Sequence, residues 1–593
     1  MEQRRLLLAI ALSIAILFGF QALYKRVAPP PPAPTAEESA PTSALPAHAP
    51  AHAMGEAGVG EAGASDGAPD AGPRLTISAP RVAGSLGLAG ARLDDLVLRD
   101  YHETIAPHSP LVQLLARPGS GAGYYVQFGW SAPAGTTLPL PDNTTLWTAS
   151  APTLTPAAPV TLSWDNGAGL RFAITLSVDD NYMFTARQSV TNTTATPVAL
   201  FPWARIRRDH TPPTSGYYIL HEGLLGVIGG RLQELTYAKA KSAGERTDGL
   251  AYQATAPGGW AGITDKYWLT ALIPAQTSDE SVAFRDVKRG DDMGYQVDFT
   301  PATPQTIAPG AEMATVTHLF AGAKEVHLLD HYERLLGIPS FDKAVDFGWF
   351  YFLTKPFFYA IDWLYHLLGN FGLAIMAFTV FVKALFFPLA NKSYKSMGKM
   401  RLLGPKMQAM RERYKDDPAR QQQEMMALYK AEGVNPASGC LPMLIQVPVF
   451  FSLYKVIFVT IEMRQAPFFG WIHDLSAPDP TNIFNLFGLI PVDPTAISPF
   501  LHLGAWPLLM GVSMFLQQKL NPPPPDPVQA RMFQFMPVIF TFMLARFPAG
   551  LVIYWTWNNL LSIGQQWLIM RSTHLGPDRE KRDREKKTKP VRT

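Results

Sequence analysis

The side chains of greatest chemical interest lie inside apolar stretches of the chain. Lys383 stands in the run Thr379-Val-Phe-Val-Lys383, where an ammonium group costs about 2.5 to 3.5 kcal/mol at a helix centre unless it meets water or a partner. Thr379 is four residues away and therefore shares a helix face with Lys383. Position alone leaves two interpretations equally open. The lysine either lines a wet cavity or extends to the membrane surface, because it lies within two turns of the end of the run.

Other polar side chains favour the cavity. Asn558, Ser562 and Gln565 fall on one helical stripe of the last apolar run, and Asn559 lies beside it. The other apolar runs contribute Gln446, Ser513 and Gln517 near their inner ends. So many amides rarely face lipid, so they either hydrogen-bond neighbouring helices or line a water-filled cavity with Lys383. Because they gather on one side, we expect a cavity closed toward the periplasm.

Covalent chemistry finds little support in the sequence. Ser513 has no histidine within an apolar run to activate it, and His221-Glu222 lacks the second histidine of a zinc-protease helix. Cys440 is the single cysteine, which excludes an intrachain disulfide. Gly398-Lys399 lacks the spacing and the following Ser or Thr of a phosphate-binding loop. We therefore expect no enzymatic activity, no cofactor and no metal.

The distribution of apolar residues predicts a membrane protein. Charged residues make up 17% of the 593 residues, against roughly a quarter in soluble domains. Arg4 and Arg5 precede an apolar run from Leu6 to Leu23, so residues 1–26 are predicted to be an N-terminal membrane anchor. Five further runs bring the prediction to six transmembrane helices: Phe371 to Leu389, Leu441 to Ile461, Leu501 to Leu516, Phe533 to Leu544 and Leu551 to Ile569.

Basic residues predict the sidedness of the chain. Lysine and arginine crowd the loop 390–438 and the tail 572–593, so both are expected in the cytoplasm together with the N-terminus. Asp417-Pro418 and Gly433 predict a helical hairpin within this loop. The tail also carries acids, so two interpretations stay open: it contacts ribosomes or anionic lipid, or it is a solvated tail.

The region between the first two apolar runs has a different character. Residues 27–74 are rich in Pro, Ala, Gly and Ser and are interpreted as a flexible linker. Leu170 to Val178 alternate apolar and polar side chains up to the turn at Asp179, which is typical of a β-strand. Similar short runs predict a periplasmic β-sandwich over residues 75–335.

Several segments closely resemble the YidC insertase family of Gram-negative bacteria. They include Pro405-Lys-Met-Gln-Ala-Met-Arg-Glu-Arg413, Gln423-Glu-Met-Met-Ala-Leu-Tyr-Lys430, Trp471-Ile-His-Asp-Leu-Ser476 and Arg92-Leu-Asp-Asp-Leu-Val-Leu-Arg-Asp-Tyr101. The resemblance implies a multi-domain inner-membrane protein with an α-helical bundle of six transmembrane helices and a periplasmic β-supersandwich. Five of the helices would form a conserved core over residues 336–571. It also implies a membrane protein insertase and chaperone with a hydrophilic groove, acting alone or with the Sec translocon.

The same resemblance implies roles for particular residues. A groove arginine of the family attracts the acidic part of an entering substrate, and Lys383 occupies the matching position here, which keeps the charge but not the bidentate fork. A hydrophobic slide is implied at Val447, Pro448, Phe450, Tyr554 and Trp555. The implied partners are nascent membrane proteins, the Sec translocon, membrane lipids and, through the hairpin and tail, the ribosome.

Two other classes of protein compete with this interpretation. A solute transporter would predict inverted repeats and interrupted helix pairs, which the sequence does not show. A purely structural assembly factor for the Sec translocon would use the same surfaces, and the sequence leaves that alternative open.

Overall fold

The computed structural model describes residues 72–215, 220–289, 292–415, 417–433, 441–498, 501–520 and 527–572. The predicted anchor (1–26), nearly all of the predicted linker (27–74), the basic tail after Ser572 and Cys440 lie outside these residues.

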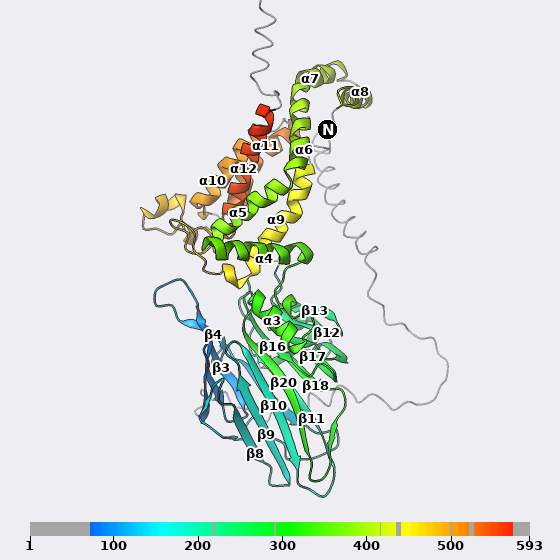
Figure 1. Cartoon of the computed structure of the whole chain (residues 1–593), viewed down its shortest axis with the longest axis vertical. Helices are drawn as coiled ribbons and strands as arrows, with labels where there is room; N and C mark the ends of the chain where they lie inside the picture. The colour runs from blue at the N-terminus through cyan, green and yellow to red at the C-terminus, as the bar shows by residue number, and fades with distance from the viewer. Residues whose placement is uncertain are drawn as a thin grey trace, which may run out of the picture. The chain divides into compact units, whose positions relative to one another are not determined.

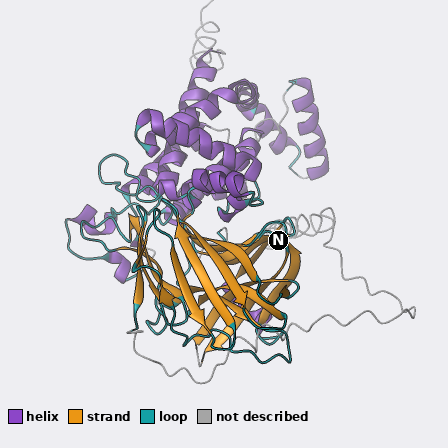
Figure 2. Ribbon diagram, turned by 60° about the horizontal axis from the view of Figure 1, so that its bottom comes forward, coloured by secondary structure: helices purple, strands orange, loops and turns teal. Residues whose placement is uncertain are grey.

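Within the described part of the chain, residues 74–323 form two large β-sheets, which Figure 2 shows in orange. The first has eleven strands: β14 (Leu250–Pro257), β17 (Asp279–Arg289), β18 (Asp292–Pro301), β11 (Val198–Arg208), β5 (Tyr124–Ser131), β3 (Arg92–His102), β2 (Val82–Gly87), β1 (Arg74–Ser78) and β7 (Thr153–Leu154) in spatial order, with β19 (Gln305–Ile307) beside β11 and β4 (Leu111–Leu115) beside β3. The second has nine: β13 (Arg231–Thr236), β12 (Gly223–Ile228), β15 (Trp260–Thr264), β16 (Trp268–Ile273), β20 (Glu312–Ala323), β10 (Met183–Asn192), β9 (Leu170–Val178), β8 (Val160–Asp165) and β6 (Thr148–Ala149).

The predicted alternation is seen most clearly in β9. Its apolar residues from Leu170 to Val178 are buried at every second position, and the residues between them are more exposed. Antiparallel pairing of β9 with β10 follows directly from the turn at Asp179, whose carboxylate accepts the backbone N–H of Asn181 at 2.9 Å. The buried side of β9 packs into an aromatic core in which Trp130 and Phe172 meet edge to face at 5.1 Å.

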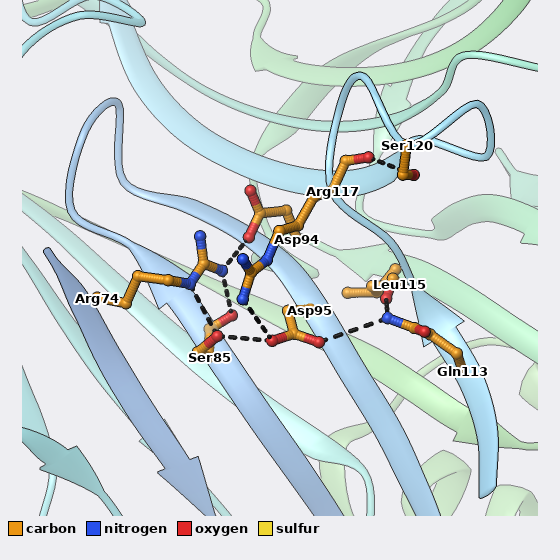
Figure 3. Close-up of polar contacts among 8 residues, drawn as sticks. All are labelled: Arg74, Ser85, Asp94, Asp95, Gln113, Leu115, Arg117 and Ser120. Carbon is orange, nitrogen blue, oxygen red and sulfur yellow. Dashed lines mark hydrogen bonds and ion pairs between the residues drawn. The ribbon is translucent and has the colours of Figure 1, made fainter. Parts of the chain in front are cut away.

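A polar network joins the first strands of the eleven-stranded sheet (Figure 3). Arg74 of β1 forms an ion pair with the fully buried Asp94 of β3, and its Nε donates to Ser85 Oγ of β2 at 2.8 Å. Ser85 in turn donates to Asp95 at 2.7 Å. Burial raises the pKa of Asp94 above its ordinary value although the contact with Arg74 opposes this shift. The network therefore fixes three neighbouring strands to one another.

Helices make up most of the described chain after residue 325. They are α3 (Val326–Leu336), α4 (Tyr351–Leu368), α5 (Phe371–Leu385), α6 (Phe387–Leu402), α7 (Gly404–Arg413), α8 (Pro418–Ala431), α9 (Leu441–Val459), α10 (Ala505–Leu520), α11 (Pro527–Leu544) and α12 (Ala549–Ser572), with short 3-10 turns at Phe341–Ala344, Ile461–Met463, Ile483–Gly488 and Pro494–Ala496 (Figure 1). A short helix, α2 (Tyr237–Gly244), lies within the β-rich part.

The run predicted as one span from Phe371 to Leu389 is divided between two helices. Phe371–Leu385 and Phe387–Met400 are bent by 68° at the break. Among the described residues no single helix combines the length and apolarity needed to cross a membrane, and this bent pair reaches both only when its two helices are taken together. The six transmembrane helices therefore stay a prediction.

The loop 390–438 contains α7 and α8. Asp417 caps α8 by accepting the backbone N–H of Arg420 at 3.0 Å, with Pro418 in the first turn. Gly433 follows α8 with a φ of 62°, a left-handed conformation suited to glycine. Lys406 of α7 and Glu432 form an ion pair of 2.8 Å that joins the two helices.

Helix α3 contacts both the strands before it and the helices after it. Lys355 of α4 forms ion pairs with Asp330 of α3, at 2.9 Å, and with the buried Asp342. On the other side Tyr332 donates to Asp179 at the start of the β9–β10 turn. Polar contacts therefore bind α3 both to the β-rich part and to the helical part of the chain.

Candidate functional site

Lys383 is held by a residue of the last helix. Its Nζ donates to Ser562 Oγ at 2.8 Å, which joins α5 to α12, and Ser562 Oγ donates to the backbone oxygen of Asn558 at 2.7 Å. No carboxylate of the described residues forms an ion pair with Lys383, and the side chain is half-buried. The ammonium group thus has a neutral hydroxyl as its hydrogen-bond partner and keeps its charge uncompensated.

Some of the predicted polar residues hold helices together. Asn559 Nδ2 of α12 donates to Ser513 Oγ of α10 at 3.0 Å, and both residues are buried. Ser513 donates onward to the backbone oxygen of Met510 at 2.7 Å. Thr379 is buried and its hydroxyl donates to the backbone oxygen of Ile375 in its own helix at 2.7 Å. For these three residues the geometry is that of hydrogen bonding between and within helices.

Two other members of the polar stripe on α12 carry atoms without a hydrogen bond. Asn558 Oδ1 and Gln565 Nε2 are both buried and have no partner among the described residues. Leaving such a group unsatisfied costs about 1 to 3 kcal/mol, so a polar partner is expected beside them. They flank Ser562, the residue that holds Lys383. Gln517 of α10 is half-buried.

The predicted slide residues come together on α9 and α12. Phe450 packs edge to face against Trp555, with ring centroids 4.7 Å apart, and stacks at 6.5 Å on Tyr554. Gln446 Nε2 donates to the Tyr554 hydroxyl at 2.6 Å. Tyr554 is buried, whereas Val447 is 42% exposed, and Pro448 lies inside α9. The residues predicted to form the slide therefore make an aromatic contact, and Val447 gives them an exposed aliphatic edge.

Two residues that were not predicted from the sequence also contact this region. Trp557 Nε1 of α12 donates to the backbone oxygen of Met376 in α5 at 3.1 Å, and Tyr394 of α6 hydrogen-bonds Ser562. Aromatic residues are common in apolar helices, and neither position differs from its neighbours by type or spacing. No signal in the sequence could have distinguished them.

The described residues contain one group of acids close enough to bind a cation. Oxygen atoms of Asp330, Glu333 and Asp342 lie within 4.8 Å of one another. The ammonium group of Lys355 already contacts Asp330 and Asp342 and supplies the compensating positive charge. The cluster is therefore explained without a metal ion.

Two cavities among the described residues are not lined by Lys383. One, of about 550 Å³, lies beside β1 and residues 146–152, and the other, of about 610 Å³, lies on α8.

Comparison with known proteins identifies the class of this chain. Residues 74–360 match the family described as "YidC periplasmic domain", and residues 363–576 match "60Kd inner membrane protein". The chain is 63% identical to "Membrane protein insertase YidC" of Granulibacter bethesdensis over 97% of this chain and 99% of the relative, and 58% identical to the protein of that name from Acidiphilium cryptum over 86% of each. A solved structure, "Active YidC insertase crystal structure with the first transmembrane domain resolved", shares 18% identity over 83% of this chain and 92% of that one, with a TM-score of 0.34.

The class is therefore that of inner-membrane protein insertases with a periplasmic domain. The chain belongs to the YidC family.

Proposed function

We propose that this chain inserts nascent membrane proteins through a hydrophilic groove lined by Lys383, Ser562, Asn558 and Gln565. One observation carries the proposal: among the described residues the Lys383 ammonium has no carboxylate partner and bonds Ser562, and the residues three or four positions from Ser562 carry a buried acceptor, Asn558 Oδ1, and a buried donor, Gln565 Nε2, without hydrogen bonds. These three polar groups are suited to bind a polar substrate segment transiently, because a permanent partner within the protein would already occupy them. Of the other predicted groove residues, Thr379, Gln446, Ser513, Gln517 and Asn559 would shape its walls.

The charge of Lys383 would select the first part of the substrate to enter. An incoming carboxylate could replace Ser562 as the partner of the ammonium, with a gain that grows as water is excluded. A lysine does this as a point charge and tolerates several approach directions, whereas an arginine would favour a bidentate geometry. A polar segment held in this way crosses less hydrocarbon, which lowers the barrier to translocation.

The apolar part of the substrate would then leave along the slide. Val447 presents an exposed edge, and Phe450 and Trp555 give a rigid aromatic surface beside it. Moving apolar side chains from water into lipid releases about 25 cal/mol per Å² of buried area. This free energy of transfer could drive insertion, so the proposed mechanism needs no covalent chemistry.

The proposed topology follows the distribution of charge. The anchor 1–26 and the five apolar runs would give six spans, with both termini and the hairpin 390–438 in the cytoplasm and the β-sandwich 75–335 in the periplasm. The Sec translocon and lipids would act as partners in the membrane. The ribosome would bind the hairpin or the basic tail.

The decisive experiment changes the charge at residue 383. We expect Lys383→Glu to reduce insertion of a single-span substrate with an acidic periplasmic tail roughly tenfold, equivalent to about 1.4 kcal/mol, and Lys383→Arg to retain it. A substrate whose tail acids are replaced by amides serves as the matched control and should be much less sensitive. Ser562→Ala removes the hydrogen bond without changing charge and should have the smaller effect. Equal insertion of both substrates by all variants would show that Lys383 only joins α5 to α12.

A further inference from the structure

An unusually apolar surface lies between α9 and α10. We call residues 482–497 the apolar finger. It exposes seven large apolar side chains: Phe484, Leu486, Phe487, Leu489, Ile490, Val492 and Ile497. Leu489 is 83% exposed and Ile497 is 77% exposed, and no charged residue occurs from Thr481 to Val492. Soluble surfaces seldom carry a contiguous apolar patch of this kind without a partner.

The backbone of the finger holds these side chains outward. Leu486 and Phe487 have φ values of 51° and 58°, a left-handed conformation that costs about 1 to 2 kcal/mol for a residue with a side chain. Asn485 stabilises the turn, since its Oδ1 accepts the Gly488 N–H at 2.9 Å and its backbone oxygen accepts the Ile490 N–H at 3.1 Å. The shape therefore depends on hydrogen bonds at the backbone and not on burial of the apolar side chains.

The base of the finger is attached to the start of α10. Asn482 Nδ2 donates to the Leu501 backbone oxygen at 2.7 Å, and the Ile483 N–H donates to Leu503 at 2.9 Å. Asp479 accepts the N–H of Trp506 at 2.8 Å in the first turn of α10. In Figure 1 the segment projects sideways from the helices next to the start of α10.

Helix α10 continues the apolar surface. Leu509, Val512 and Leu516 lie on one helix face and are all exposed. Polar groups lie at the two ends of the apolar residues 484–492. At the base Trp471 Nε1 donates to Asp479 at 3.1 Å and the indole is partly exposed, and on the other side the exposed Asp493 follows Val492. An apolar stretch between a hydrogen-bonded tryptophan and an exposed carboxylate has the order of groups found across a membrane interface.

From this gradient we propose that the apolar finger lies in the bilayer, at the boundary between headgroups and acyl chains of the leaflet on the side where α9 ends and α10 begins. Lipid is the occupant that the chemistry favours, because residues 482–492 offer aliphatic and phenyl side chains and no charge for a protein partner to recognise, and the one acid of the finger, Asp493, follows them and is exposed. The left-handed turn then places in lipid those apolar side chains whose exposure to water is unfavourable. The contact would anchor the start of α10, the helix that carries Ser513.

A single-cysteine experiment tests the proposal on the full chain. In a Cys440→Ser background, Leu489→Cys and Ile497→Cys are labelled with an environment-sensitive fluorophore and reconstituted into vesicles of phosphatidylethanolamine and phosphatidylglycerol. Thr136→Cys, an exposed position in the β-rich domain, is the matched control. We expect nitroxides placed high on the acyl chains to quench both finger labels several-fold more than the control, and aqueous iodide to quench them several-fold less.

Either of two results would overturn the proposal. Iodide quenching at Leu489 as strong as at Thr136 would place the finger in water. Protection from iodide without quenching by the nitroxide lipids would mean that protein, from this chain or a second copy, covers the finger. Because Leu489 and Ile497 are so exposed, neither substitution removes packing that the fold needs.

Discussion

Glu462 joins the helical part of the chain to α3 through one carboxylate. Its Oε1 accepts the N–H of Val326, the first residue of α3, at 3.0 Å, and its Oε2 is buried and has no hydrogen-bond partner among the residues that the structure describes. Burial raises the pKa of Glu462 to about 8, and the nearby charges of Glu325 and Asp362 act in the same direction. Arg81 pairs with Glu325, and His327 pairs with Asp362.

This carboxyl should make stability depend on pH. A glutamate with a raised pKa binds more protons in the folded state, so its contribution is fully present below about pH 4.5 and is lost as the pH rises toward 8. Glu462→Gln keeps an oxygen for Val326 and cannot ionise. We expect the wild-type unfolding midpoint in detergent, followed by tryptophan fluorescence, to fall more between pH 5 and pH 8 than that of Glu462→Gln. The exposed Glu245→Gln is the control and should behave like wild type; equal slopes for all three would contradict the assignment.

The individual residues of the candidate site were only partly predictable from the sequence. The spacing of Asn558, Ser562 and Gln565 predicted one face of a helix, and the structure places Lys383 against that face through Ser562. The partner itself could not be read from the sequence, because the two residues are 179 positions apart. Nor could spacing distinguish Asn559, which hydrogen-bonds Ser513 of another helix, from Asn558, whose Oδ1 has no partner within the described part of the chain.

Elements were predictable where one physical signal dominates. Alternation identified β9, but β5 is buried at all its positions and therefore carries no period of two. Hydropathy located the run from Phe371 yet could not register the 68° bend, because the residues on both sides are apolar. Helix α4 was not predicted because Lys355, Asp362 and His366 interrupt its apolar residues. Lys355 and Asp362 form ion pairs with α3, and His366 contacts Asp362 within α4.

The segment after α9 holds the turn between β3 and β4. Arg464 Nη2 donates to the backbone oxygens of His102 at 2.6 Å and Glu103 at 3.1 Å, and the guanidinium lies 5.3 Å from the ring centre of Trp268. Gln465 Nε2 adds a bond to His102 at 3.2 Å. One arginine therefore uses hydrogen bonds and a cation–π contact together.

Removing that arginine should loosen the turn selectively. We expect Arg464→Ala to speed amide hydrogen exchange in residues 103–110 about tenfold, since two bonds to a charged donor are lost. Arg464→Lys should fall in between, because a lysine lacks the planar fork. Arg99→Ala, which removes a single exposed bond to Ser78, is the control and should leave residues 103–110 unchanged. Unchanged exchange in Arg464→Ala would show that Gln465 and packing suffice.

For the whole molecule, the charge of the loops should determine which side of the membrane each part occupies. In a Cys440→Ser background we expect a membrane-impermeant maleimide to label Thr136→Cys in intact spheroplasts, because the β-rich domain is proposed to be periplasmic. Gln422→Cys, exposed on α8, should react only after lysis, because the hairpin carries the excess of lysine and arginine. The reverse pattern, or equal labelling of both sites before lysis, would contradict the six-span topology.

Because α3 contacts both the β-rich part and the helical part, its position determines where the chain can be shortened. Glu325 pairs with Arg81, which directly precedes β2, whereas the N–H of the next residue, Val326, donates to Glu462 beyond the end of α9. A deletion of the β-rich part that stops before Val326 keeps Asp330 beside Lys355. A deletion that continues to Leu335, the border expected from the sequence, leaves the Lys355 ammonium with Asp342 as its only remaining carboxylate partner of the two. It also removes the backbone N–H that donates to the Glu462 carboxylate. A trimmed insertase is therefore best begun at the first residue of α3.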